Sequence, residues 1–218
     1  MATLLIHSLQ SRYAALQAER ERSWAPAQLE ANARQRRILT QRFDSAAIAQ
    51  PGDMLPDFAF QEVGGERPTL KGLTRDRSAL FIFFRFAGCP ACNIALPYYA
   101  ETLFPELTRR GIPLVALSPQ QPDRLEEIKV RHDLPFFVAT DSSNQFANHL
   151  GIAFEPDDRP APPPPGWIGE VTGTGTWLLP QPAVLHVDSD RKIRSLLVSP
   201  DWLDRPEAEQ ILRNIIDT

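Results

Sequence analysis

The pattern of apolar and polar positions changes near Pro51. Over residues 3–48, apolar side chains recur at the three- and four-residue spacing of an amphipathic helix. This helical stretch is interrupted at Pro26, because proline cannot continue a helix from within. After Pro51, short apolar runs alternate with helical stretches. We therefore expect a helical arm over residues 1–50 and an α/β domain over residues 51–218.

The second region predicts a mixed β-sheet covered by helices. Strands are expected at residues 58–62, 79–85, 112–117, 136–139, 183–187 and 193–198, and helices at residues 90–110, 123–132, 142–150 and 206–217. The run 79–84 is apolar at every position, which is typical of a strand buried on both faces. Ser142 and Ser143 are placed to cap the third helix. Strands that alternate with helices, followed by a strand pair and a last helix, indicate a mixed sheet with helices on both faces.

A segment rich in proline and glycine, residues 154–180, interrupts this order. It contains four consecutive prolines, residues 162–165, which favour an extended polyproline II spacer. We interpret it as a loop or lid rather than a ligand for a proline-binding partner, because one such tract is weak evidence for a partner. Trp167 and Trp177 flank the tract, and an indole ring favours a partly buried position. The segment is therefore expected to fold over another part of the protein, with the cysteine site described below as the candidate.

Charge and composition exclude several classes of function. The 218 residues carry a formal net charge of -4 with a pI near 5.6, so neither a nucleic acid nor an anionic membrane surface would attract the chain. No apolar run approaches the length that crosses a bilayer. The N-terminal residues lack the basic region and the cleavage site of a signal peptide. With only two cysteines, we expect a cytoplasmic protein in which the cysteines are catalytic rather than structural.

These two cysteines form the motif Cys89-Pro-Ala-Cys92, directly after the apolar strand. The thiolate is the reactive form of cysteine, and a helix N-terminus stabilises it through the helix dipole and unpaired backbone N–H groups. Pro90 suits the first helical position, because its missing N–H would be unpaired there in any case. Cys89 is therefore the expected N-cap and the more exposed sulfur, and Cys92 is expected one turn further on and buried. The spacing predicts a pair that makes and breaks a disulfide.

Other interpretations of these side chains are weaker. A zinc site needs about four ligands, whereas this chain offers one cysteine pair and four histidines scattered without ligand spacing. We therefore expect no metal and no cofactor. His186 falls inside a predicted strand and is expected to pack in the sheet rather than to act as a base. A purely structural disulfide is disfavoured in a reducing compartment.

Several motifs occur in an order that is typical of one family. They are Gly52-Asp-Met-Leu-Pro-Asp-Phe58, the strand with its cysteine pair, Leu117-Ser-Pro-Gln120 and Pro182-Ala-Val-Leu-His-Val-Asp188. In these features residues 51–218 resemble the peroxiredoxin-like branch of the alkyl hydroperoxide reductase/thiol-specific antioxidant family. The resemblance implies a thioredoxin fold, a helix kinked at Pro97 and a cis peptide bond before Pro182, beside the active site.

The resemblance also implies thiol-based redox chemistry, of which two forms stay open. In thiol peroxidase chemistry, a thiolate attacks a peroxide and the second cysteine condenses with the resulting sulfenic acid. In dithiol exchange, Cys89 attacks a protein disulfide and Cys92 resolves the mixed disulfide. The chain departs from the usual peroxiredoxin pattern, because the expected threonine is absent and Pro182 occupies the position of the peroxide-orienting arginine. Arg85, at the end of the strand, is the candidate substitute.

The candidate site thus consists of Cys89 and Cys92 as catalytic residues, with Pro182, Arg85 and Pro90 shaping it. The implied partners are a peroxide or a protein disulfide as substrate and a thioredoxin- or glutathione-type reductant. The N-terminal helices are also a candidate for a homodimer contact. A third hypothesis is a redoxin fold used as a binding module without catalysis, against which the paired cysteines argue. The sequence does not determine which cysteine would react with peroxide.

Overall fold

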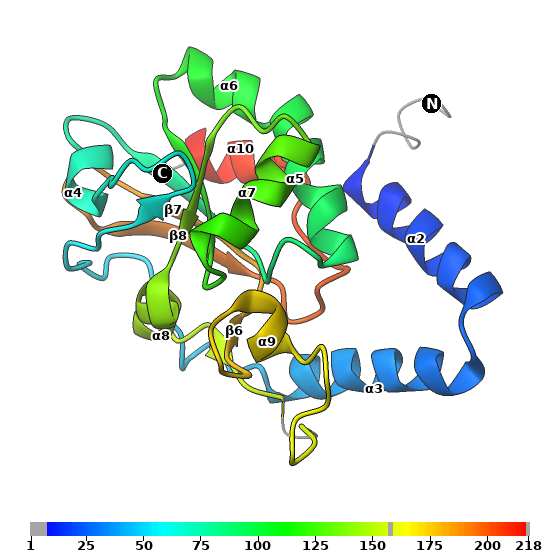
Figure 1. Ribbon diagram of the computed structural model, residues 1–218. Coiled ribbons are helices and arrows are strands. Elements are labelled where there is room, and N and C mark those ends of the chain that lie inside the picture. The colour runs from blue at the N-terminus through cyan, green and yellow to red at the C-terminus, as the bar shows by residue number, and fades with distance from the viewer. Residues whose placement is uncertain (1–7, 157–158, 217–218) are drawn as a thin grey trace.

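A six-stranded mixed sheet forms the centre of the computed structural model, which describes residues 8–156 and 159–216 (Figure 1). Its strands, in the spatial order β1-β4-β3-β2-β7-β8, are β1 (Gln61–Glu62), β2 (Ala79–Phe83), β3 (Leu114–Ser118), β4 (Phe137–Thr140), β7 (Ala183–Val187) and β8 (Ile193–Val198). Strands β2, β3 and β4 are parallel, whereas β1, β7 and β8 run antiparallel to their neighbours. The predicted mixed α/β sheet of thioredoxin type is confirmed.

Helices cover both faces of this sheet. They are α2 (Leu9–Ser23), α3 (Pro26–Arg42), α4 (Leu70–Leu73), α5 (Pro90–Thr102), α6 (Phe104–Arg109), α7 (Pro122–Arg131), α8 (Gln145–His149), α9 (Ile168–Thr172) and α10 (Ala208–Ile216), with a short 3-10 turn η1 (Ser142–Asn144). Side chains of β2 alternate between the faces: Leu80 and Ile82 share a core with α5, α7 and α10, whereas Phe81 and Phe83 stack edge-on against Phe146 of α8. Every residue of β2 is buried, which confirms a strand covered on both faces.

The long helix predicted over residues 90–110 is divided into α5 and α6 at Leu103. The division falls just before Pro105, which has no N–H with which to continue the helical hydrogen bonds. Pro97, where a kink is predicted, lies inside α5 without ending it. Of the predicted strand 58–62, only the last two residues pair with β4, and these form β1.

The side chain that caps α8 comes from Asp141 rather than from the predicted Ser142 or Ser143, although Asn144 is the N-cap residue. The two carboxylate oxygens of Asp141 accept hydrogen bonds from the N–H groups of Phe146 and Ala147, each at 2.9 Å. Ser143 adopts a left-handed backbone conformation with a φ of 57°, so the chain makes one tight turn before α8 begins. The Asp141 side chain therefore reaches the start of α8 from the other side of this turn.

The N-terminal helices α2 and α3 are separated just before Pro26, as predicted. Helix α2 runs beside α5 (Figure 1), and its Leu9 and Tyr13 are buried in the same core as the two cysteines. Residues 1–7, which include the start of the predicted helix and the stretch tested for a signal peptide, lie outside the described residues, as do residues 217–218 of the predicted last helix. Of the helices described, none is long and apolar enough to cross a membrane.

The proline-rich segment forms α9 and a small two-stranded sheet of β5 (Ala153–Phe154) and β6 (Leu179–Pro180). Its two tryptophans, Trp167 and Trp177, lie together with ring centroids 4.9 Å apart. The segment packs on the turn between β3 and α7, where the Gln121 N–H donates to the Thr172 carbonyl at 3.1 Å. The expectation that this segment folds over the cysteine site is therefore wrong. Helix α2 packs over the cysteines instead. Residues 157–158 of the tract lie outside the described residues.

Candidate active site

The cysteine motif begins α5 as predicted. Cys89 is the N-cap, with φ -73° and ψ 118°, and Pro90 occupies the first helical position. The Cys89 carbonyl accepts hydrogen bonds from the N–H groups of Cys92 and Asn93, each at 3.0 Å. Both cysteines are free thiols, and each can reach the other across the first turn of the helix.

Both sulfurs are more enclosed than the sequence suggested. Cys89 is 3% exposed and Cys92 is 0% exposed, so the predicted exposed nucleophile at the helix start is itself buried. The reason is the packing of α2 over the beginning of α5. The Tyr13 hydroxyl of α2 donates to the Ala91 carbonyl, between the two cysteines, at 3.3 Å.

The side chain that contacts the redox pair is Arg205, which no feature of the sequence singled out. Its Nη2 donates to Cys92 Sγ at 3.3 Å, and its Nε donates to the Trp202 carbonyl at 3.1 Å. Arg205 is only 3% exposed. It lies in the segment between β8 and α10, 113 positions from Cys92, so local spacing could not have connected them. The one signal in the sequence is that Arg205 follows closely on Trp202 and Leu203, an apolar pair of the kind that is usually buried.

Electrostatics place the negative charge of the pair on Cys92. Burial by itself raises the pKa of Cys92, but the hydrogen bond from the Cys89 thiol and the charge of Arg205 outweigh it and hold that pKa well below its usual range. The pKa of Cys89 is raised well above its usual value, because Cys89 donates its hydrogen to Cys92 and is buried. The two sulfurs thus share one proton. This differs from the expected low pKa at Cys89, because the arginine reaches the second sulfur and not the first.

Arg85, the candidate substitute for a peroxide-orienting arginine, lies close to the pair without being its principal contact. Its guanidinium stacks over the ring of Trp202 at 4.6 Å, and its charge lowers the pKa of Cys89 in opposition to the larger effects of Cys92 and burial. Trp202 therefore contacts both arginines: its ring packs against Arg85, and its carbonyl accepts the hydrogen bond from Arg205.

Pro182 borders the site, but its peptide bond is trans. Among the described residues the one cis peptide bond precedes Pro162, which corrects the cis geometry that the family resemblance implied. The chain instead enters β7 in extended form, with the Gln181 N–H donating to the Ile152 carbonyl at 2.8 Å. Pro182 and Arg205 line a cavity of about 10 Å³, which has room for a single water-sized molecule.

The Ser-Pro-Gln motif holds the loop that carries the cysteines. The Ser118 hydroxyl donates to the Arg85 carbonyl at 2.9 Å, and Gln120 Oε1 accepts from the Ala87 N–H at 2.7 Å. Asn93 on α5 donates to the Ala87 carbonyl at 2.6 Å from the opposite side. Because these bonds fix the backbone between β2 and α5, they position both sulfurs.

His186 is packed in the sheet, as expected. It is 5% exposed, and burial lowers its pKa to about 4. It lies opposite Leu80 and Ser195 in the neighbouring strands. Within the described part of the chain, no cluster of three or more histidine, cysteine, aspartate or glutamate side chains is arranged to hold a metal ion.

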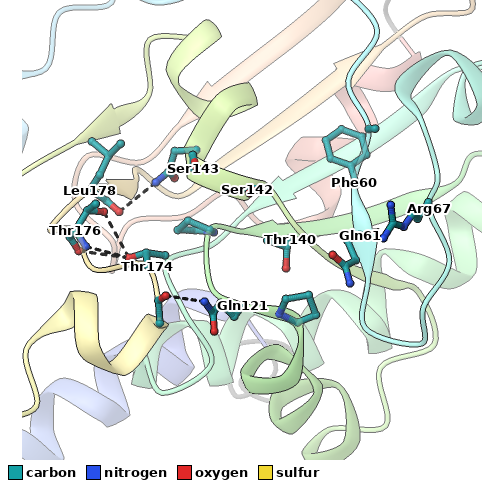
Figure 2. Close-up of a pocket in the computed structure, with 15 residues that line it drawn as sticks. Phe60, Gln61, Arg67, Gln121, Thr140, Ser142, Ser143, Thr174, Thr176 and Leu178 are labelled. Carbon is teal, nitrogen blue, oxygen red and sulfur yellow. Dashed lines mark hydrogen bonds between the residues drawn. The ribbon is translucent and has the colours of Figure 1, made fainter.

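A cavity of about 490 Å³ lies beyond the Ser-Pro-Gln turn. Figure 2 shows Gln61 and Arg67 on one side of it and Thr174 and Thr176 of the proline-rich segment on the other, with the Gln121 side chain bonded to that segment. Neither cysteine lines this cavity, which is therefore separate from the redox pair.

The sequence matches the model of the AhpC/TSA family over residues 51–196, well over half of the chain. The chain therefore belongs to this family, whose peroxiredoxin members are thiol peroxidases. No curated protein matches the sequence.

Solved peroxiredoxins have the same fold. The peroxidoxin BcpB of Mycobacterium tuberculosis is 17% identical, with a TM-score of 0.59 over 77% of this chain and 97% of that one. Reduced Prx3 of Vibrio vulnificus, solved in complex with hydrogen peroxide, is 18% identical, with a TM-score of 0.61 over 76% of this chain and 98% of that one. The yeast mitochondrial 1-Cys peroxiredoxin is 18% identical, with a TM-score of 0.57 over 78% and 76%. At these identities the likeness establishes the thioredoxin-like fold of peroxiredoxins.

Proposed function

We propose that this protein is a thiol peroxidase in which Cys92 attacks the peroxide and Cys89 resolves the product. The observation that carries the proposal is the hydrogen bond from buried Arg205 to Cys92 Sγ at 3.3 Å. A thiolate is the nucleophile in peroxide reduction, and the buried guanidinium stabilises that charge together with the hydrogen bond from the Cys89 thiol. Arg205 supplies from the segment before α10 the positive charge that the sequence lacks at Pro182.

The proposed reaction uses the proton shared by the two sulfurs. The Cys92 thiolate attacks the terminal oxygen of a hydroperoxide, the O–O bond breaks, and Cys92 becomes a sulfenic acid. The departing alkoxide or hydroxide takes the proton of the Cys89 thiol and leaves as an alcohol or water. The Cys89 thiolate then attacks the Cys92 sulfur and expels hydroxide, which solvent protonates. The peroxide is reduced by two electrons, and the two thiols are oxidised to one disulfide.

The burial of the pair favours a small oxidant over a protein disulfide. A protein disulfide must bring its own sulfur into line with an attacking thiolate, whereas Cys89 is 3% exposed and Cys92 is 0% exposed beneath α2. A hydroperoxide is much smaller and needs a smaller opening. Dithiol exchange with proteins is therefore the second candidate, and the closed site argues against it.

Other parts of this proposal rest on the sequence and the family. The family match begins at residue 51, which supports an arm over residues 1–50 and a redoxin domain over residues 51–218. For the reductant, the family supports a thioredoxin- or glutathione-type thiol, and the closed site favours the smaller glutathione type. A homodimer through the N-terminal helices and a cytoplasmic location stay predictions.

Peroxide consumption tests the proposal directly. Hydrogen peroxide and cumene hydroperoxide would be offered to the wild type, Cys89→Ser and Cys92→Ser with excess dithiothreitol, and insulin reduction would be measured in parallel. We expect turnover of peroxide by the wild type, loss of activity in Cys92→Ser, and no insulin reduction above the uncatalysed rate. Rapid insulin reduction without peroxide turnover would replace the proposal with dithiol exchange.

A further inference from the structure

Three arginines lie around the redox pair, and each has a buried side-chain nitrogen without a hydrogen-bond partner among the described residues. Arg20 and Arg205 are buried residues, whereas Arg85 is half-buried. Arg20 Nη1, Arg85 Nε and Arg205 Nη1 are inaccessible to solvent and have no hydrogen-bond partner among the described residues. Arg20 is 5% exposed and Arg205 is 3% exposed. A buried cationic N–H group is costly to leave unpaired. Three of them around one site indicate a place prepared for an anion.

Arg20 reaches this site because α2 runs antiparallel to α5. Near its start, Arg12 pairs with Glu101 at the far end of α5 at 2.6 Å. Tyr13 then reaches back to the Ala91 carbonyl in the first turn of α5. Arg20 follows on the same face of α2, about 10 Å further along the axis, beyond the first turn of α5. Its guanidinium stacks over the ring of Trp24 at 4.8 Å and is near enough to Cys89 for the two charges to interact. The charge of Cys89 accordingly raises the pKa of Arg20 against the lowering effect of burial.

The carboxylates near this cluster are bound elsewhere. Glu207 accepts hydrogen bonds from the first N–H groups of α2 and from the Tyr98 hydroxyl. Asp201 is held by both the Nε and the Nη2 of Arg36, at 2.7 Å each. Asp204, the remaining acid of the segment between β8 and α10, is exposed. In the reduced protein the Cys92 thiolate is thus the negative charge that faces the arginines, and formation of a Cys89–Cys92 disulfide would remove it.

We propose that Arg20, Arg85 and Arg205 form an anion-binding site that selects a small anionic thiol as the reductant of the oxidised protein. This inference rests on the proposed function, because it requires the Cys89–Cys92 disulfide. The three guanidiniums lose their counter-charge when the disulfide forms, so an anionic group is attracted most strongly in the state that needs reduction. Arg20 makes the arm α2 part of this binding site.

The reduction balances with two equivalents of thiol. The first thiolate attacks Cys89, the sulfur with the greater exposure, and expels Cys92 as a thiolate next to Arg205. A sulfur of low pKa is the better leaving group, so this direction is favoured. A second thiolate attacks the outer sulfur of the mixed disulfide and releases Cys89, which takes a proton from solvent. The protein regains two thiols, and the two reductant molecules leave as one disulfide.

Matched thiols of different charge test the proposal. The disulfide would be formed with diamide and checked by thiol titration, and then reduced with 2-mercaptoethanesulfonate, 2-mercaptoethanol or cysteamine, which share a two-carbon chain but carry negative, neutral and positive groups. Rates would be compared per thiolate. We expect the anionic thiol to be at least about tenfold faster than the neutral one, and cysteamine to be the slowest.

Two arginines on the same helix provide the variant and its control. Arg20→Gln should bring the anionic-to-neutral rate ratio down several-fold toward one. Arg22→Gln removes the same charge from an exposed side chain that pairs with Glu19 and should leave the ratio unchanged. Equal rates for all three thiols in the wild type, or an equal fall in Arg22→Gln, would overturn the proposal.

A second measurement needs no variant. Ethanesulfonate has the charge and shape of the anionic reductant but no thiol, so it should slow reduction by 2-mercaptoethanesulfonate in the wild type at matched ionic strength. No slowing would count against the site. Because diamide replaces peroxide, a protein that forms the disulfide but does not turn over peroxide loses only the peroxidase assignment. If neither oxidant closes the disulfide, the proposed function fails and this inference fails with it.

Discussion

Replacing Arg205 by glutamine should raise the pKa of Cys92. The guanidinium donates to Cys92 Sγ at 3.3 Å in a fully buried site. A hydrogen bond to a charged group contributes about 1.5–3 kcal/mol, and one pKa unit corresponds to about 1.4 kcal/mol. Loss of this bond and of the positive charge should therefore raise the pKa of Cys92 by about 1–2 units.

The assay is the pH dependence of alkylation by iodoacetamide, with the modified cysteine identified by mass spectrometry. In the wild type, Cys92 should react at lower pH than Cys89, and in Arg205→Gln its titration should move upward. Arg36→Gln is the control, because Arg36 holds the same segment through Asp201 but does not contact sulfur. The reasoning is refuted if the Cys92 titration stays in place in Arg205→Gln, or if Arg36→Gln shifts it equally.

Three further predictions concern stability. Burial lowers the pKa of His186 to about 4, from 6.5 in the unfolded chain. Because the unfolded state therefore binds the proton first as the pH falls, the free energy of unfolding should decrease between about pH 6.5 and pH 4, by at most about 3 kcal/mol. His186→Leu should remove this slope in urea titrations at several pH values, and an unchanged slope would refute the assignment. Glu207→Gln weakens the bonds to the start of α2 and should cost about 1–2 kcal/mol in urea unfolding; an unaltered midpoint would show that α2 does not depend on this cap. Asp141→Ala should cost about 1–2 kcal/mol and Ser142→Ala close to none, and the reverse order would restore the serine cap.

The sheet and the start of the helix that carries the cysteines could be predicted from the sequence, because both depend on local patterns. The buried strand β2 is a continuous apolar run, and Pro90 after Cys89 marks a helix start in the chain itself. The Ser-Pro-Gln motif was visible as part of a family resemblance. Its role became visible only when the structure placed Ser118 and Gln120 against the cysteine loop.

What could not be predicted depends on contacts between distant parts of the chain. Arg205 meets Cys92 across 113 positions, in a segment without regular secondary structure. The burial of Cys89 results from the docking of α2, and an amphipathic helix does not reveal which surface its apolar face will cover. An exposed Cys89 is therefore a reasonable prediction for an isolated helix start, whereas in the assembled protein the docking of α2 buries this cysteine.

The central claim, that the reactive thiolate is Cys92, is tested most directly by trapping the first oxidation product. Cys89→Ser and Cys92→Ser would each receive one equivalent of hydrogen peroxide in the presence of dimedone, and mass spectrometry would locate the adduct. We predict a sulfenic acid adduct on Cys92 in Cys89→Ser and little reaction in Cys92→Ser. An adduct that forms rapidly on Cys89 in Cys92→Ser, with Cys92 unmodified in Cys89→Ser, would contradict the account.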